Sequence, residues 1–473
     1  MNGRRLLSAA LTVLAVANLG TGDAAAQPFA DRARALPSQF KADVLIRIAD
    51  SGKIRSRRTV SDLLEEAFYA ADGAEERVTL DLAGTGRAGM RDYIRARSFA
   101  AGLDRLTLQS RVLRLLAVVD LKKARELAGA LDLHLPALKC EDPLVYNVDN
   151  VYKNLTVYAS ALPDVDRFTL IQRYITTMTS PAQVDPMAQL LVSVVMPRDE
   201  RILLAQSFAA ELGRMGDDDR TFTATIERDK LPAHIKDFIE QLRRQAYDPG
   251  AVVIAFRTYL VKRFTARRCA DGFDAPDLRI VQWFNDDLRL MTTSEIKKID
   301  YEEYRGRRSG AHAIAHEMDS SGAEYVTLTR ELSASLPVRR ERVAVVNGLG
   351  PDVKTPERLV GDVLVWQGRG ERSQADFLYK KATMLQRLLT EALPGVLHEL
   401  VRGELVTFLS YAWQGVDRQI EWFLQVNTLL DYGRRTGKAE LGKVLDALQS
   451  TSNAIMSTYG GLEGYAPLRL LKE

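Results

Sequence analysis

Along most of this chain, hydrophobic residues recur at steps of three and four, which is the period of one face of an α-helix. The clearest example is the stretch 104–131, where Asp120 stands between two apolar stripes and can cap the second helix through its side-chain oxygen. The stripes are Leu108, Val112, Leu115, Leu116 and Val119, then Leu121, Ala124, Leu127, Ala128 and Leu131. This pattern predicts two short amphipathic helices joined at a tight turn.

A hairpin of this size cannot bury both apolar faces alone, so it needs neighbours of the same kind. Similar pairs are predicted to start near residues 104, 148, 183, 218 and 250, roughly 32–44 residues apart. Such spacing is typical of two-helix solenoid repeats. No residue signature recurs at the same place in each pair, so an irregular helical domain is the alternative.

The whole chain is therefore predicted to be all-α, with antiparallel helical pairs that form an α-solenoid or a layered helical array. Earlier helices are expected to begin at Leu36-Pro37 and behind a cap at Thr59. The expected parts are a cleaved signal peptide (1–26), a helical-pair array (27–300), an irregular connector (301–354) and a C-terminal helical block (355–473). The block opens at Pro356, which suits the first turn of a helix.

The N-terminus has the pattern of a secretory signal. Arg4 and Arg5 precede the apolar run 6–19, and the small residues 24–26 suit a signal peptidase. The run is shorter than the ~20 residues of a membrane-spanning helix, although an uncleaved anchor is the alternative. We expect cleavage between Ala26 and Gln27, export to a bacterial periplasm or the extracellular space, and no stable membrane anchor afterwards.

The chain has two cysteines, Cys140 and Cys269. In an oxidising compartment two cysteines most simply form one disulfide, which here would close a loop of about 130 residues. The alternative is two separate thiols.

Charge is nearly balanced, because 65 Lys and Arg residues face 62 Asp and Glu residues. The formal net charge of +3 does not favour nucleic acid as a partner.

One weak metal site can be named. His312 and His316 stand four positions apart with Glu317 adjacent, and on a helix this spacing places two imidazoles on one face, as in zinc hydrolases. Ala313 occupies the position where the hydrolase motif requires glutamate, and no third ligand is evident. His134, His234 and His398 are isolated in the sequence and are expected to be structural or solvent-facing.

Gly84, Gly86 and Gly89 match the dinucleotide-binding fingerprint. The fold context does not fit, because a second parallel strand ending in an acid should follow and an amphipathic helical pair follows instead. No cofactor and no catalytic residue are therefore predicted.

These observations favour an exported, non-catalytic helical scaffold or binding protein, whose partner is another protein or a component of the cell envelope. Two alternatives stay open. One is a metal-dependent hydrolase with its site in the 300–350 region, and the other is a helical protein that binds a small ligand.

Overall fold

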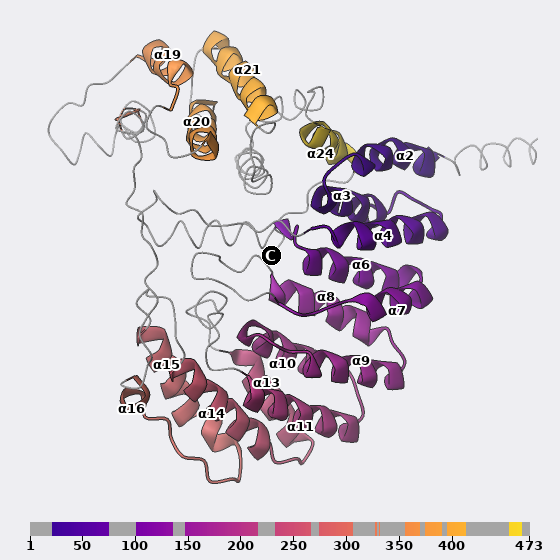
Figure 1. The fold of residues 1–473 in the computed structure, drawn as a ribbon, viewed down its shortest axis with the longest axis vertical. Coiled ribbons are helices and arrows are strands. Elements are labelled where there is room, and N and C mark those ends of the chain that lie inside the picture. The colour runs from indigo at the N-terminus through magenta and orange to yellow at the C-terminus, as the bar shows by residue number, and fades with distance from the viewer. Residues whose placement is uncertain are drawn as a thin grey trace, which may run out of the picture. The chain divides into compact units, whose positions relative to one another are not determined.

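The computed structural model confirms the predicted all-α fold: every element of the described residues is an α-helix or a short 3-10 helix. The described residues are 21–74, 101–135, 147–215, 232–265, 274–305, 327–328, 331, 355–368, 374–389, 395–412 and 454–465. The helices belong to two compact units (Figure 1). Unit 1 contains α2, α3, α19, α20, α21 and α24, and unit 2 contains α4 and the helices from α6 to α16.

Unit 2 consists of short helices in close sequence. They are α4 (Arg57–Ala71), α6 (Arg105–Val119), α7 (Leu121–Ala130), α8 (Val148–Ser160), α9 (Asp164–Thr176), η1 (Pro181–Gln183), α10 (Val184–Ser193), α11 (Arg198–Arg214), α13 (Ala233–Arg244), α14 (Gly250–Thr265), α15 (Asp274–Asp286), η2 (Leu288–Met291) and α16 (Tyr301–Arg305).

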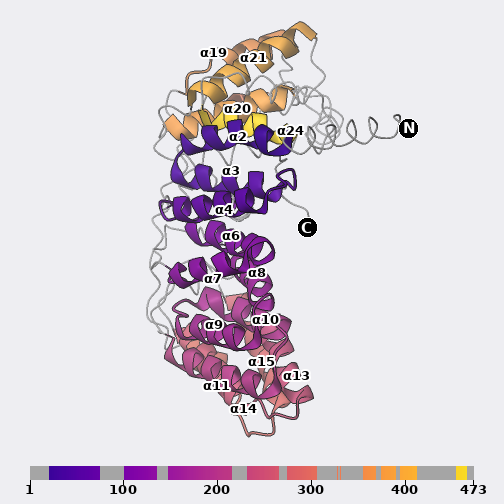
Figure 2. The ribbon, with the colours of Figure 1, turned by 90° about the vertical axis from the view of Figure 1, so that its right-hand side faces the viewer.

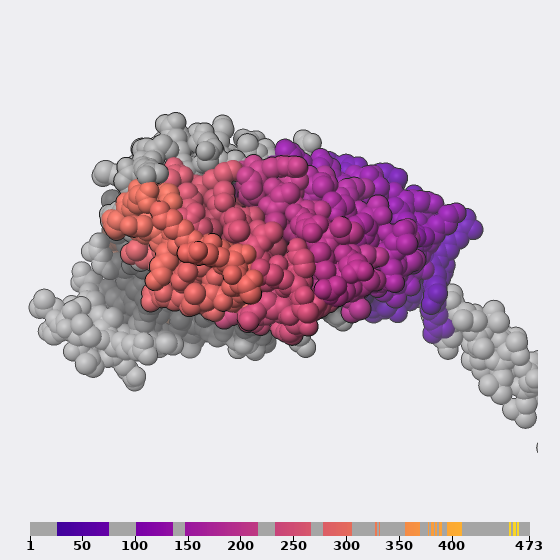
Figure 3. Space-filling view, turned by 90° about the horizontal axis from the view of Figure 1, so that it is seen from below, coloured from indigo at the N-terminus to yellow at the C-terminus, as the bar shows by residue number. Residues whose placement is uncertain are grey.

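These helices stack in two layers. In the first layer α6, α8, α10 and α13 pack one on the next, and in the second layer α9, α11 and α14 do the same. Helices within a layer run in the same direction: His234 at the start of α13 meets Asp185 at the start of α10, and Gln241 further along meets Val192. In the space-filling view, colour changes in chain order across the face shown, as expected when each pair packs mainly on its neighbours (Figure 3).

The predicted pair at 104–131 is confirmed. It forms α6 and α7, and Asp120 accepts a hydrogen bond from the backbone N–H of Lys123 at 3.1 Å. The predicted apolar residues Leu108, Val112 and Leu116 are buried. This agreement follows from the local origin of helix periodicity and capping.

One predicted helix start and one predicted pairing of helices need correction. The helix assigned to a cap at Thr59 begins earlier, because the Ser56 hydroxyl accepts the backbone N–H of Thr59 at 3.2 Å and α4 starts at Arg57. A helix does begin at Gly250, but the prediction that it opens a pair is wrong. There, α14 is the second helix of a pair whose first helix is α13, since α13 packs on α10 and α14 on α11. The predicted start near 218 lies outside the described residues.

The described turns from the first to the second layer lie at one edge of unit 2, because helices in each layer run the same way. We call this the turn edge. It comprises Asp120 and the segments 161–163, 194–197 and 245–249.

The helix at the centre of this packing is α6, which contacts α4 on one side and α8 on the other. Two of its buried polar residues, Gln109 and Ser110, form hydrogen bonds with these neighbours. Gln109 donates to Asp72, which follows α4, at 2.7 Å. Ser110 accepts a bond from the side-chain amide of Asn154 in α8 at 3.1 Å. These bonds orient α6 between its neighbours more specifically than apolar packing would.

Unit 1 contains helices from both ends of the chain. They are α2 (Thr21–Arg34), α3 (Ser38–Asp50), α19 (Pro356–Val365), α20 (Gln374–Leu389), α21 (Gly395–Ala412) and α24 (Ala454–Tyr465). The predicted helix start at Thr355 is confirmed, with its hydroxyl accepting the backbone N–H of Arg358. α24 packs on both α2 and α3, and Figures 1 and 2 show it beside α2.

A buried acid joins α24 to α3. The Asp43 side chain is fully buried and accepts hydrogen bonds from the Tyr459 hydroxyl at 2.9 Å and from Arg47 Nε at 2.6 Å. The Phe40 ring stands edge-on to the Tyr459 ring, with centroids 6.2 Å apart. A buried carboxylate is costly unless it accepts hydrogen bonds. Tyr459 therefore stabilises this packing both through its hydroxyl, which donates to Asp43, and through the apolar contact of its ring.

Another buried ion lies between α19, α20 and α21. Lys381 Nζ donates to the carbonyl oxygens of Leu364 at 2.9 Å and Trp366 at 3.2 Å, at the C-terminal end of α19. Glu404 on α21 lies 3.7 Å from the same nitrogen. Burial lowers the pKa of Lys381, and Glu404 partly opposes that shift.

Among the described residues, none of the helices combines the length and apolar character needed to cross a bilayer.

Replacing Tyr459 by phenylalanine should destabilise unit 1. The change keeps the ring but removes one donor from a fully buried carboxylate, so we expect a loss of about 1–3 kcal/mol in urea unfolding. Tyr69→Phe is the matched control, because the Tyr69 side chain is exposed and its hydroxyl should contribute less than about 0.5 kcal/mol. Equal stability of the two variants would contradict the role given to the Tyr459–Asp43 bond.

Candidate functional site

The predicted metal and disulfide residues cannot be placed, since His312, His316 and Glu317 lie outside the described residues, as do Cys140 and Cys269. The glycines 84, 86 and 89 lie outside them as well. Within the part of the chain that the structure describes, no group of three or more His, Cys, Asp or Glu residues could hold a metal ion.

The predicted signal cleavage site falls inside α2. Ala26 is buried in that helix, and the Gln27 side-chain amide donates to Asp31 at 2.8 Å. Cleavage between Ala26 and Gln27 would separate residues 21–26 of α2 from residues 27–34. Processing stays a prediction.

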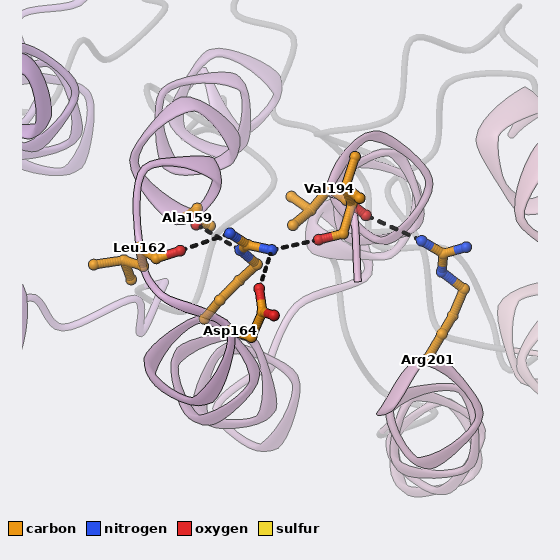
Figure 4. A network of polar contacts seen from close by, with 7 residues as sticks. Ala159, Leu162, Asp164, Val194 and Arg201 are labelled. Atoms are coloured by element: carbon orange, nitrogen blue, oxygen red, sulfur yellow. Dashed lines mark hydrogen bonds and ion pairs between the residues drawn. The ribbon is translucent and has the colours of Figure 1, made fainter. Parts of the chain in front are cut away.

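The most densely connected polar group at the turn edge is the guanidinium of Arg167, on the first turn of α9. It donates to the carbonyl oxygens of Ala159 at 3.1 Å and Leu162 at 2.6 Å, at the end of α8. It also bonds Asp164 at 3.0 Å and the carbonyl oxygen of Val195 at 2.6 Å (Figure 4). One cation therefore joins the end of α8, the start of α9 and the turn after α10.

The next pair repeats this arrangement. Arg201 on α11 is buried and donates to the carbonyl oxygen of Val194, the C-cap of α10, at 3.1 Å (Figure 4). Arg198 reaches onward to the carbonyl oxygen of Gln245, the C-cap of α13, at 2.8 Å. The last carbonyls of a helix have no partner within it, so a cation from the following helix satisfies them and complements the helix dipole.

Cations also cap helix ends at the opposite edge. Arg173 on α9 donates to the carbonyl oxygens of Ala128 at 2.7 Å and Leu131 at 3.1 Å, at the end of α7. Lys262 on α14 donates to those of Gly213 at 2.9 Å and Met215 at 2.7 Å, at the end of α11. Each bond joins one helical pair to the pair before it. Hydrogen bonds from cationic side chains to backbone carbonyls therefore help to hold successive pairs together.

The sequence contains a signal for the turn-edge cations that the search for repeats missed. Pro163 is followed four positions later by Arg167, and Pro197 by Arg201, which is a recurrence at 34 residues. Proline ends one helix and is favoured at the start of the next. The cation four positions later then lies close to the C-terminal carbonyl groups of the helix that has just ended. Pro232 and Lys236 show the same spacing, but there Lys236 pairs with Asp287.

Apolar side chains stand exposed around these cations. Val157 belongs to the end of α8, Val165 to the first turn of α9, and Val195 to the turn that Arg167 binds, and all three are exposed. Leu203 on α11 is exposed as well. The turn edge and the helix turns next to it therefore carry exposed hydrophobic residues, beside the largely buried Arg167 and the buried Arg201.

His234, which the sequence analysis expects to be structural or solvent-facing, has a structural contact. Its Nδ1 lies 2.7 Å from Asp185 Oδ2, and its backbone N–H donates to Asp185 Oδ1 at 3.1 Å. Burial raises the pKa of Asp185, whereas the bond with His234 acts in the opposite direction. The pair links α10 to α13 across 49 sequence positions. No local sequence pattern predicts this contact.

A buried acid also stands at the start of α6. Asp104 Oδ1 accepts the backbone N–H of Thr107 at 2.8 Å, as an N-cap does. Within the described part of the chain, no hydrogen-bond partner is present for its Oδ2. Burial raises the pKa of Asp104 to about 6, despite the opposing effect of the Thr107 bonds.

Comparisons with known proteins add little. No protein-family model matches the chain, and no curated protein matches it. One solved structure, described as a "circular tandem repeat protein with novel repeat topology and enhanced subunit contact surfaces", aligns with 98% of this chain and 90% of its own at 12% identity. Its TM-score of 0.14 is too low to carry an argument. The paired-helix architecture therefore rests on the packing described above.

Arg167→Ala should destabilise unit 2 by about 2–4 kcal/mol, because it removes a nearly buried cation and leaves several helix-end carbonyls without their donor. Urea unfolding followed by circular dichroism measures the change. Arg198→Ala is the control: the Arg198 side chain is half exposed and bonds one carbonyl, so its loss should cost less than about 1 kcal/mol. Similar small effects for both variants would contradict the conclusion that Arg167 holds the end of α8, the start of α9 and the turn after α10 together.

Asp104→Asn should change how stability depends on pH. Asparagine still caps α6 but cannot ionise. Because the folded-state pKa of Asp104 is raised from 3.8 to about 6, the native chain binds more protons between these values, and stability falls as pH rises through them. Relative to wild type, the variant should gain up to about 3 kcal/mol between pH 4 and pH 7. A stability difference that is constant over this range would refute a buried, protonatable Asp104.

Proposed function

We propose that this protein is an exported, non-catalytic helical scaffold that binds another protein or a component of the cell envelope at its turn edge. The observation that carries the proposal is the exposed group Val157, Val165 and Val195 beside the largely buried Arg167. Exposed apolar residues that gather at one place, on a rigid backbone, are typical of interaction sites.

The charged residues of the turn edge support a binding role. The donors of Arg167 are directed at carbonyl oxygens, and those of Arg201 point the same way. They fix the positions of the turns, and a preorganised surface loses less conformational entropy when a partner binds. Stacked helical pairs commonly use such surfaces to bind other proteins.

Export is supported by the N-terminal pattern. The basic residues Arg4 and Arg5, the apolar run 6–19 and the small residues 24–26 suit a cleaved signal peptide. An exported scaffold of this kind would meet its partner in the cell envelope or outside the cell.

Site-specific crosslinking tests the proposal. A photoreactive phenylalanine analogue in place of Val165 or Val195, in cells of the source bacterium, should yield a discrete crosslinked product, because both side chains face solvent at the turn edge.

Mass spectrometry of the exported chain should show Gln27 as its first residue.

Asp237, an exposed residue on α13 away from the valines, serves as the control position. The same products from all three positions, or none from either valine, would contradict binding at the turn edge. Full-length chain found only inside the cytoplasm would contradict export.

A further inference from the structure

The predicted signal cleavage site divides α2 just before a proline. Pro28 lies inside the helix Thr21–Arg34. Proline has no N–H and its ring clashes with the carbonyl group four positions earlier, so it is disfavoured in a helix interior, whereas the first turn tolerates it. Cleavage after Ala26 would make Pro28 the second residue of the chain. The position of this proline therefore fits a mature α2 that begins at Gln27.

The part of α2 that remains after cleavage contains the contacts that hold the helix. Ala30 and Ala33 are buried, and α2 packs on both α3 and α24. A Cβ atom at Gly461 of α24 would lie 3.3 Å from the Phe29 ring, so the two helices approach closely there. Gln27 would therefore be the first residue of a packed helix.

The side chain of Gln27 lies beside a carboxylate. Gln27 is exposed, and its side-chain amide nitrogen donates to Asp31 Oδ1 at 2.8 Å. The same oxygen of Asp31 pairs with Arg34 at 2.8 Å. Because side chains four positions apart lie on one face of a helix, Asp31 can hold the amide of Gln27 in this position.

A glutamine that becomes the first residue of a chain can cyclise. Its free α-amine attacks the carbon of the side-chain amide, the bond from that carbon to the amide nitrogen breaks, and a lactam ring called pyroglutamate forms. The proton lost by the amine is transferred to the departing nitrogen, which leaves as ammonia, so no oxidant or co-reactant is needed. Because both reacting groups belong to one residue, the reaction benefits from proximity.

Two features of α2 favour this reaction at Gln27. The positive end of the helix dipole disfavours a protonated α-amine, and the neutral amine is the nucleophile. In addition, Asp31 accepts a hydrogen bond from the nitrogen that has to leave. A carboxylate in that position can take the proton from the amine and pass it to this nitrogen.

We propose that the exported chain carries pyroglutamate as its first residue, formed from Gln27 with the assistance of Asp31. The inference rests on the proposed export and names a modification of the exported chain. Cyclisation removes a positive charge from the start of α2, where it opposes the helix dipole. It also removes the free amine that aminopeptidases require, which protects the segment of α2 that packs on α24.

A chain that begins at Gln27 tests the modification without depending on export. It can be released from a fusion protein by a protease that cuts directly before this residue. During incubation at neutral pH, mass spectrometry should show the N-terminal peptide losing the mass of one ammonia. Gln27→Asn is the control and should keep its free amine, because asparagine would have to close a smaller and more strained ring.

A second variant tests the carboxylate. Asp31→Asn should slow cyclisation by about tenfold, because acid–base assistance is lost. Arg34→Gln is the matched control: it removes an ion-pair partner of Asp31 but keeps the carboxylate, so cyclisation should not slow. Circular dichroism of both variants should match wild type. Equal rates for Asp31→Asn and wild type would overturn the role of Asp31.

A free α-amine that persists on the chain beginning at Gln27 would overturn the modification. Exported chain recovered from cells separates this inference from the proposed function. Chain that begins at Gln27 with a free amine would overturn the modification and leave export standing. Full-length chain found only in the cytoplasm would contradict export and the modification together, because Gln27 would never become the first residue.

Discussion

The structure depends on how the carbonyl groups at helix ends are satisfied. Each helix leaves about four C-terminal carbonyls without an internal partner, so a stack of short helices has many of them. Here, basic side chains from a neighbouring helix supply the donors, as Arg167, Arg173 and Lys262 do in unit 2. Lys381 does the same in unit 1. Because each donor comes from a different helix, satisfying the backbone also fixes which helices are neighbours.

This arrangement separates two tasks among the residues of unit 2. Apolar packing of the layers gives most of the stabilisation, and it is tolerant of small shifts between helices. Hydrogen bonds such as Asn154 to Ser110, and Arg201 to Val194, are directional and permit one register. At the turn edge, the bonds from Arg167 to Val195 and from Arg201 to Val194 hold the turn after α10 in place, and with it the exposed Val195 side chain. A surface of this kind can recognise a shape as well as a chemical type.

Much of the fold could be predicted because its determinants are local. The periodic stripe of Leu108, Val112 and Leu116 gave α6, and Asp120 marked the turn to α7. The candidate site could be predicted only in part. The recurrence of Pro163 and Pro197 with their cations is present in the sequence, but its meaning depends on which carbonyls lie nearby. The link between His234 and Asp185 depends on stacking and has no local signal.

The bond between Asp43 and Tyr459 has a consequence for synthesis of the chain. The two residues are 416 positions apart, so α3 is made long before the helix that completes its environment. Pairings this distant in sequence form slowly, and until then the Tyr459 hydroxyl and ring are absent from around Asp43 and Phe40. Until translation reaches α24, unit 1 therefore lacks one of its helices, and the surface of α3 that α24 covers stays open to chaperones.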